Sequence, residues 1–328
     1  MTQSPPSGDV RFLVTGAQGC IGAWVVYRLV TAGYAPVAFD LDPEPRRLRL
    51  IATPDEMASV RFVAGDITDG DHLARVISAQ GITHIIHLAA LQVPACRADP
   101  LLGARINVLG TLNVFEAARR FPDQVRRIVY ASSAAVFGPE EIYTTLPVPD
   151  SGPLAPTSHY GVFKQCNEGN ARIYWQDHGL SSIGLRPWTV YGVGRDQGMT
   201  SDPTRAILAA LRGQRFHIGF GGRTDMQYVD DVARIFIACA LASCEGAPVF
   251  NLHSDVVTVD AIIDAIDAAV PGARDLITHG DRPIAIAPAL DDRGLRSLLG
   301  DVPHTPLSVG IADTAERFRR LLAAGWQD

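Results

Sequence analysis

Short apolar runs alternate with longer amphipathic stretches along the first part of the chain. The runs are almost continuously apolar, which is typical of strands buried on both faces of a parallel sheet. The stretches between them are long enough for helices that cross from one strand to the next. The pattern therefore predicts an α/β fold with a doubly wound parallel sheet. The predicted strands cover residues 10–14, 35–39, 61–64, 84–88, 128–131 and 183–185.

Beyond about residue 187 the rhythm loosens, and glycine-rich turns such as 219–222 separate the helical stretches. We expect a smaller lobe there, over the carboxyl ends of the strands, where open α/β sheets bind ligands. The helical stretches lie near 204–213, 231–243, 258–269 and 308–324. The expected division is a disordered Pro/Ser-rich tail over 1–9, a Rossmann-type domain over 10–186 and a mainly substrate-binding lobe over 187–328, with residues of about 225–252 returning to the first domain.

Composition narrows the classes of partner. The 328 residues are 47% hydrophobic and 20% charged, as in a folded globular protein, and the net charge is −6. An acidic balance argues against nucleic acid or an anionic membrane surface, so we expect small-molecule chemistry. The sequence shows no apolar run of transmembrane length and no signal peptide, which predicts a cytoplasmic protein. Five scattered cysteines without a CxxC pair favour neither a disulfide framework nor a metal site.

A glycine turn follows the first predicted strand and precedes a helical stretch. Its sequence is Gly16-Ala-Gln-Gly19-Cys20-Ile21-Gly22. Glycines let the backbone approach a pyrophosphate, and a helix N-terminus offers unpaired N–H groups to it. The spacing is a weak signal by itself, and a purely structural turn is the alternative. The turn predicts that the domain over 10–186 binds a dinucleotide.

Asp40 ends the second predicted strand, where a carboxylate can accept hydrogen bonds from the adenosine ribose and repel an added phosphate. This favours NAD over NADP, although Arg46 or Arg47 could reach back toward a phosphate. The next two strand ends fit the same pocket, with small residues that leave room for a cofactor. They supply Asp66, Ile67, Leu88, Ala89 and Ala90 as further cofactor-binding candidates.

Lys164 is the only lysine among 29 basic residues. A drift from lysine to arginine should spare only a site that needs a compact ammonium group instead of a planar fork. Tyr160 stands four residues earlier, so a helix would present both side chains on one face. The pair predicts a phenol and an ammonium in one catalytic pocket. The alternative is an ordinary lysine on a helix surface.

Taken together, these residues resemble the extended short-chain dehydrogenase/reductases, and among them the NAD-dependent epimerase/dehydratase family. The resemblance rests on the glycine turn, on residues 88–90, on Ser133 with Tyr160-x-x-x-Lys164, and on residues 185–192 and 227–233. It implies that Ser133 bonds the substrate oxygen and that Tyr160 exchanges the hydroxyl proton. Lys164 would bind the nicotinamide ribose and, together with the oxidised nicotinamide, lower the pKa of the phenol. Asn107 would help to hold the cofactor site.

The resemblance also separates the possible reactions. Family members that dehydrate or decarboxylate carry acidic residues just after the serine, where this chain has Ala134 and Ala135. Alanine cannot move a proton, so dehydrogenation and 4-epimerisation remain. Sugar-nucleotide epimerases have Asn, Arg and often Lys where this chain has Thr189, Thr224 and Gln92. Arg195 and Arg223 could substitute for the missing arginine. The substrate-binding candidates are Gln92, Ser133, Thr189, Arg195, Arg223 and Gln227.

We therefore favour an NAD-dependent dehydrogenase acting on a secondary alcohol of a sugar, polyol or sugar acid. The alternative is a UDP-hexose 4-epimerase with tightly bound NAD, and a more remote one is a non-enzymatic NAD-sensing regulator. The resemblance implies a homodimer as well, formed through helices over about 99–120 and 158–177.

Overall fold

The computed structural model describes residues 9–42 and 44–327. The prediction of a disordered tail over 1–9 falls, except for Asp9, outside the described residues. In this part of the chain no helix combines the length and the apolar character needed to cross a membrane.

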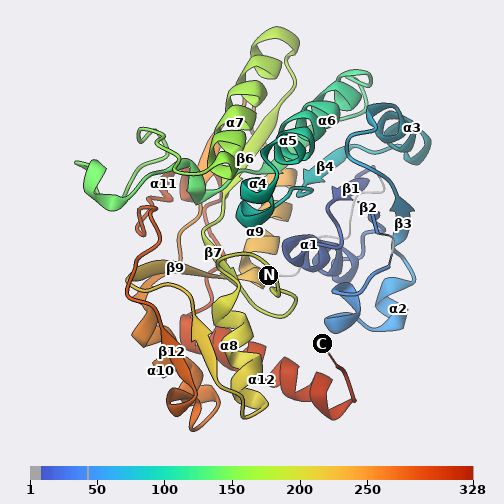
Figure 1. Cartoon of the computed structure of the whole chain (residues 1–328). Coiled ribbons are helices and arrows are strands. Elements are labelled where there is room, and N and C mark those ends of the chain that lie inside the picture. Colours follow the sequence, from blue (N-terminus) through green and yellow to red (C-terminus); the bar gives the residue numbers. More distant parts are fainter. Residues whose placement is uncertain (1–8, 43, 328) are drawn as a thin grey trace.

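A seven-stranded parallel sheet forms the centre of the fold, in the order β10-β6-β5-β4-β1-β2-β3 (Figure 1). The strand order reverses between β1 and β4, so the two halves wind in opposite directions from this point. The prediction of a doubly wound, Rossmann-type parallel sheet is confirmed. The strands are β1 (Phe12–Thr15), β2 (Val37–Asp40), β3 (Arg61–Ala64), β4 (His84–His87), β5 (Arg127–Ala131), β6 (Ser182–Arg186) and β10 (Val249–Asn251).

Helices cover both faces of this sheet because successive strand residues point to opposite sides. In β1, Phe12 and Val14 pack with α1 (Cys20–Thr31) and α9 (Val229–Leu241), whereas Leu13 packs with α3 (Gly70–Gln80) and α6 (Gly110–Arg119). Both clusters are closed to solvent, which explains the apolar runs of the sequence. The helices on the second face are α3 (Gly70–Gln80), α6 (Gly110–Arg119) and α7 (His159–His178), and α2 (Pro54–Met57) is a short turn before β3.

The C-terminal lobe, yellow to red in Figure 1, contains two small sheets that the sequence pattern did not predict. One has the order β11-β9-β7 and the other pairs β8 with β12. Their strands are only three to six residues long and mix apolar with polar residues, so no long apolar run marks them. The bounds are β7 (Thr189–Tyr191), β8 (Phe216–Ile218), β9 (Arg223–Tyr228), β11 (Asp255–Thr258) and β12 (Ile277–His279).

The four helices predicted for this half are present, with ends that differ by at most two residues. They are α8 (Asp202–Leu211), α9, α10 (Val259–Ala269) and α12 (Leu307–Ala323), and α11 (Arg293–Leu299) is an additional one. Of these, α9 packs on the large sheet beside α1, and β10 extends that sheet next to β6. The chain thus crosses between sheet and lobe more than once, and the division at residue 186 stays a prediction.

Candidate active site

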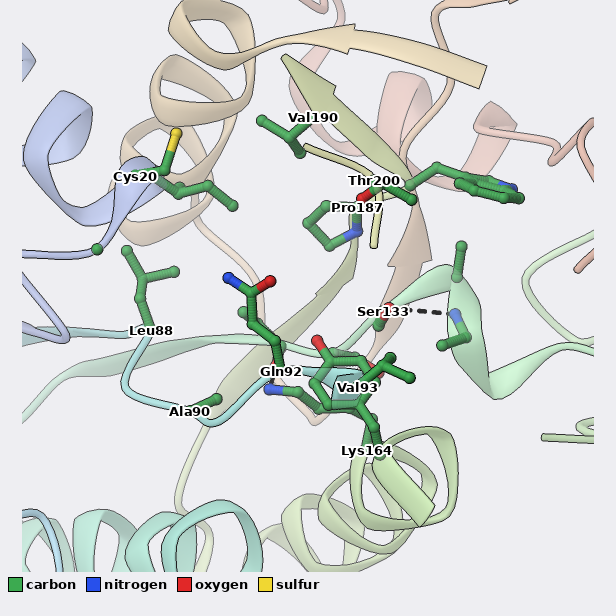
Figure 2. A pocket seen from close by; sticks show the side chains of 18 of the residues that line it. Cys20, Leu88, Ala90, Gln92, Val93, Ser133, Lys164, Pro187, Val190 and Thr200 are labelled. Atoms are coloured by element: carbon green, nitrogen blue, oxygen red, sulfur yellow. Dashed lines mark hydrogen bonds between the residues drawn. The ribbon is translucent and has the colours of Figure 1, made fainter. Parts of the chain in front are cut away.

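A cavity of about 200 Å³ lies at the carboxyl ends of β1, β4, β5 and β6 and adjoins a longer groove of about 800 Å³. We call them the catalytic cavity and the long groove. Figure 2 shows Gln92, Ser133 and Lys164 around the cavity, next to Leu88 and Ala90 from the end of β4. Gly16, Gly19, Cys20, Leu88, Ala90, Gln92 and Arg195 border both spaces.

The glycine turn forms the wall shared by the two spaces. Gly16 has a φ of +68°, and a Cβ there would lie 2.5 Å from the amide nitrogen of Ala89. A Cβ on Gly22 would lie 2.1 Å from the Gly16 carbonyl oxygen, so α1 can approach the loop this closely only because Gly22 has no side chain. Gly19 caps α1 with no side-chain hydrogen bond. The first N–H groups of this helix have no partner within the helix, so this end of α1 could hold a phosphate group of a cofactor.

Gly22→Ala tests this arrangement. The added methyl group must push the helix away from the loop, so we expect loss of bound NAD and a fall of about 1–3 kcal/mol in the free energy of unfolding. Gly169→Ala is the matched control, because a Cβ there meets nothing within 4 Å. Cofactor content after purification and thermal unfolding measure the two effects. Equal cofactor content in the two variants would contradict the role of the turn.

Asp40 stands at the end of β2 and lines the long groove, where its Oδ2 accepts a hydrogen bond of 2.8 Å from the Gln18 backbone N–H. Arg47 donates to the Gln18 carbonyl (2.7 Å) and to the Asp196 carboxylate (2.7 Å). Arg47 is therefore already occupied and does not offer its guanidinium to a ribose phosphate. Asp66, Ile67, Leu88, Ala89 and Ala90 line the same groove, as predicted from the strand ends.

The three predicted catalytic residues converge on the catalytic cavity. Ser133 follows β5 and caps the short η3 turn (Ala134–Val136), with its Oγ accepting from the Ala135 N–H at 3.1 Å. Helix α7 begins after Ser158, whose side chain caps it, so Tyr160 lies in the first turn. Lys164 lies one turn later, with Nζ 5.5 Å from the Tyr160 ring centroid. Its ammonium donates to the Ala131 carbonyl at 2.6 Å.

Burial dominates the titration of both groups. Burial raises the pKa of the Tyr160 phenol, while the Ser133 hydrogen bond and the Arg195 charge act to lower it. The lowering of this pKa that we expected from Lys164 is therefore not seen in the chain itself, where desolvation outweighs the nearby charges. Burial lowers the pKa of Lys164 to about 8, partly offset by Cys96 and Glu168.

Asn107 lies in a π-helical turn, η2 (Arg105–Leu109), and is almost fully buried. Its Oδ1 accepts from the Leu91 N–H at 2.7 Å, and its Nδ2 donates to the Leu91 carbonyl at 2.9 Å. Its predicted part in holding the cofactor site stays a prediction, because Asn107 itself lines neither the catalytic cavity nor the long groove. Instead it fixes the segment that follows β4.

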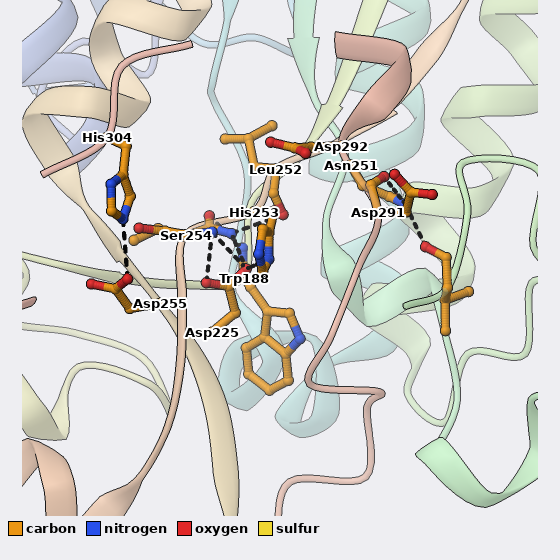
Figure 3. A network of polar contacts seen from close by, with 12 residues as sticks. Trp188, Asp225, Asn251, Leu252, His253, Ser254, Asp255, Asp291, Asp292 and His304 are labelled. Carbon is orange, nitrogen blue, oxygen red and sulfur yellow. Dashed lines mark hydrogen bonds and ion pairs between the residues drawn. The ribbon is translucent and has the colours of Figure 1, made fainter. Parts of the chain in front are cut away.

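The structure places three predicted substrate residues away from the cavity. Thr189 is fully buried and hydrogen-bonded to Thr224, with 2.6 Å between the hydroxyl oxygens. Arg223 is an exposed partner of Glu140, at 2.8 Å. Gln227 accepts from the Trp188 N–H at 2.9 Å and donates to Asp225 and to the Leu252 carbonyl, at 3.1 Å each. Figure 3 shows Asp225 and Trp188 in this internal network. Gln92, Ser133 and Arg195 remain at the cavity.

Two buried networks behind the cavity were missed from the sequence. In one, Ser132 donates to Glu168, which binds Arg186 through two bonds of 2.8 Å. In the other, His87 connects Thr15 (2.7 Å) with Thr111 (3.0 Å). Burial lowers the pKa of His87 to about 3, so the ring stays neutral. Only the position of Glu168, four residues after Lys164 on α7, gave a signal in the sequence.

Apolar side chains form the rest of the cavity wall. Trp188, Met199 and Ile286 line it together with Ala134 and Ala135. The two alanines offer no proton donor or acceptor beside Ser133, as the sequence indicated. Among the described residues no group of three or more His, Cys, Asp or Glu side chains is arranged to hold a metal ion.

Comparisons with known proteins agree with this geometry. The sequence model of the NAD dependent epimerase/dehydratase family matches residues 12–252. The UDP-glucose 4-epimerase of Mycolicibacterium smegmatis is 32% identical, over 94% of this chain and 99% of that protein. The Thermotoga maritima UDP-glucose 4-epimerase with UDP-glucose superposes with a TM-score of 0.81 and 25% identity, covering 95% and 100% of the two chains. MoeE5 in complex with UDP-glucuronic acid and NAD has a TM-score of 0.79 and 30% identity, covering 94% and 99%.

Proposed function

The chain belongs to the NAD-dependent epimerase/dehydratase family, and on that premise we propose that it is a 4-epimerase of UDP-linked sugars. It is an NAD-dependent enzyme of the extended short-chain dehydrogenase/reductase type, as the sequence predicted. The relatives favour the epimerase over the free-sugar dehydrogenase that we preferred from the sequence. The observation that carries the proposal is the similarity to a UDP-glucose 4-epimerase along nearly the whole of both chains.

The residues present fit NAD. The N-terminal end of α1 after Gly19, which has no side-chain cap, suits the pyrophosphate. The Asp40 carboxylate suits the adenosine ribose hydroxyls. Lys164 would bond the nicotinamide ribose from the catalytic cavity. Bound NAD supplies reversible hydride transfer at the sugar carbon.

The proton chemistry belongs to the chain itself. Tyr160 takes the proton of the substrate hydroxyl while the carbon that carries this hydroxyl loses its hydride. Tyr160 returns the proton when the hydride comes back to that carbon. Ser133 donates a hydrogen bond to the same oxygen, which orients it toward the phenol. The Ser133 hydrogen bond and the Arg195 charge oppose the burial that disfavours a phenolate. Epimerisation requires that the oxidised sugar turn its other face toward the nicotinamide before the hydride returns.

A dehydrogenase acting on a compact substrate is the second candidate, and one observation favours it. The hydroxyl groups of Thr189 and Thr224 bond each other inside the lobe, so these two positions supply no cation to a diphosphate. A smaller, unphosphorylated sugar, polyol or sugar acid needs no such cation.

One assay separates these functions. The purified protein is incubated with UDP-sugars and separately with free sugars, polyols and sugar acids, each with NAD. Interconversion of 4-epimers without net NADH supports the epimerase. Net NADH with a free substrate would replace it by the dehydrogenase, and absence of turnover on every substrate would favour the NAD-sensing regulator.

We also propose the homodimer that the resemblance implied. Exposed apolar side chains gather on α5 (Pro100–Ala104), η2 and α7, which contact one another. Leu101 is 84% exposed and Leu109 is 54% exposed. Burying such a patch against a second copy removes apolar surface from water. The exposed apolar residues of this surface are Leu101, Leu102, Leu109, Val162 and Ile173.

A cytoplasmic location also stays a prediction.

Leu101→Asp combined with Leu109→Asp should therefore halve the mass in light scattering at micromolar concentration. Carboxylates placed in the buried interface would oppose association. Val309→Asp is the control, because Val309 is 55% exposed on α12, away from these helices. A monomeric wild-type chain, or a variant that stays dimeric, contradicts this interface.

A further inference from the structure

Arg195 brings a cation to the border between the catalytic cavity and the long groove. It lies on the loop after β7, where its backbone N–H closes a turn onto the Gly192 carbonyl at 3.0 Å. Its Nη2 donates to Thr200 at 2.9 Å. With the Gln92 amide oriented to satisfy both of its neighbours, Gln92 accepts from Arg195 Nη1 at 3.2 Å and donates to the Gln197 carbonyl at 3.2 Å. The guanidinium is thus held from both ends.

The loop is shaped for this pair of side chains. Gly198 has a φ of +95°, and a Cβ there would lie 1.7 Å from the Gln92 Oε1 and 3.4 Å from Arg195 Nη2. Only glycine lets the loop pass this close, which keeps both side chains at the cavity.

The guanidinium still has unused hydrogen-bonding capacity. Its Nε is buried and has no partner among the described residues, and no carboxylate of those residues pairs with Arg195. A buried N–H without a partner is costly, and a charged one more so, unless a ligand supplies the acceptor. Nε and Nη2 together form the edge of the fork that binds a carboxylate through two parallel bonds.

The other basic side chains that the sequence suggested for this site are already engaged. Lys164 donates to the Ala131 carbonyl, Arg47 binds Asp196, and Arg223 binds Glu140 at the surface. Trp188 and Ile286 make the remaining wall apolar. An anionic group on the substrate would therefore find its partner in Arg195.

We infer that Arg195, held by Gln92 and Thr200, binds the carboxylate of a hexuronate and so makes UDP-linked uronates the preferred substrate class. This inference rests on the proposed 4-epimerase function. In a uronate the carboxylate is attached to the carbon next to the one that is oxidised, so its partner must lie near the catalytic phenol. Arg195 meets this condition, since it lines the catalytic cavity together with Tyr160. MoeE5, solved with UDP-glucuronic acid, is a relative of the chain.

The test compares the epimerisation of UDP-glucuronate and UDP-glucose by the wild type, Arg195→Gln and Arg195→Lys. For Arg195→Gln we expect kcat/KM to fall by roughly 10- to 150-fold with UDP-glucuronate and by less than about threefold with UDP-glucose. Arg195→Lys keeps the positive charge but not the planar guanidinium, so the fall of kcat/KM with UDP-glucuronate should be intermediate. Arg223→Gln, which removes an exposed arginine of the same lobe, should change neither value.

NAD content and affinity are measured for each variant, because the cofactor pyrophosphate is another anion near the glycine turn. Loss of NAD binding in Arg195→Gln with an unchanged preference between the sugars would overturn the inference in favour of a cofactor contact. An equal loss with both sugars would overturn it as well. A wild type that epimerises UDP-glucose but not UDP-glucuronate leaves the proposed function standing and refutes the uronate preference. A wild type inactive on both refutes the proposed function itself.

Discussion

Tyr160→Phe should lower kcat by about 100- to 10,000-fold while NAD remains bound, because the change removes only the phenolic hydroxyl. The ring keeps its shape in the first turn of α7, so the cavity and the helix cap at Ser158 stay as they are. What is lost is the group that takes and returns the substrate proton beside Ser133. Product formation with the best substrate measures the effect, and cofactor content measures the retained binding.

Tyr174→Phe is the matched control on the same helix. Its hydroxyl donates to Glu116 at 2.7 Å near the C-terminal end of α7, and Tyr174 does not line the catalytic cavity. We expect this variant to keep wild-type turnover. If Tyr160→Phe retained more than a tenth of the activity, another group would have to move the proton, and the assignment of Tyr160 would be wrong.

The central sheet and the catalytic pair could be predicted because local sequence determines them. A strand buried on both faces is mostly apolar, so β1 with Phe12, Leu13 and Val14 stands out against its surroundings. The glycine turn is confined to seven residues, and the four-residue spacing of Tyr160 and Lys164 needs only a helix. These features do not depend on how distant segments pair.

The substrate wall could not be predicted because distant strands decide it. β7 pairs in parallel with β9, with Thr189 beside Met226, and this register brings the Thr189 and Thr224 hydroxyls together inside the lobe. The same pairing directs Gln227 toward the Trp188 backbone instead of the cavity. Whether a polar strand residue faces a ligand or its neighbour depends on register, which a single sequence does not reveal.

The roles of Asn107 and Glu168, which support the site, could not be predicted either, because their contacts join segments that are distant in the sequence. Asn107 is a poor helix former, and the sequence pattern could not distinguish a solvated position from a buried one. Its amide bonds the Leu91 backbone 16 residues away, and Glu168 bonds Ser132 36 residues away. Each contact depends on the packing of α7 or η2 against the strand ends.

Lys164→Met should abolish turnover and at the same time stabilise the fold at neutral pH. The ammonium is almost fully buried, with a pKa lowered to about 8, so folding carries the cost of removing a charge from water. Methionine has a similar length and no charge. From the lowered pKa we expect the free energy of unfolding to rise by up to about 3 kcal/mol at pH 7, less the lost hydrogen bond to Ala131. Thermal unfolding and product formation measure the two effects.

The pH dependence of this gain separates desolvation from simple repacking. A lysine with a lowered folded pKa binds fewer protons in the folded than in the unfolded chain between about pH 8 and 10.5, so wild-type stability rises with pH in this window relative to the variant. The gain of Lys164→Met over the wild type in the free energy of unfolding should therefore be full below about pH 8 and shrink above it. Lys164→Arg keeps the charge in the same buried space, so it should gain no stability and should still lose most of its activity, because a planar fork replaces a compact donor. A gain in Lys164→Met that is independent of pH would mean that the buried charge costs the fold nothing.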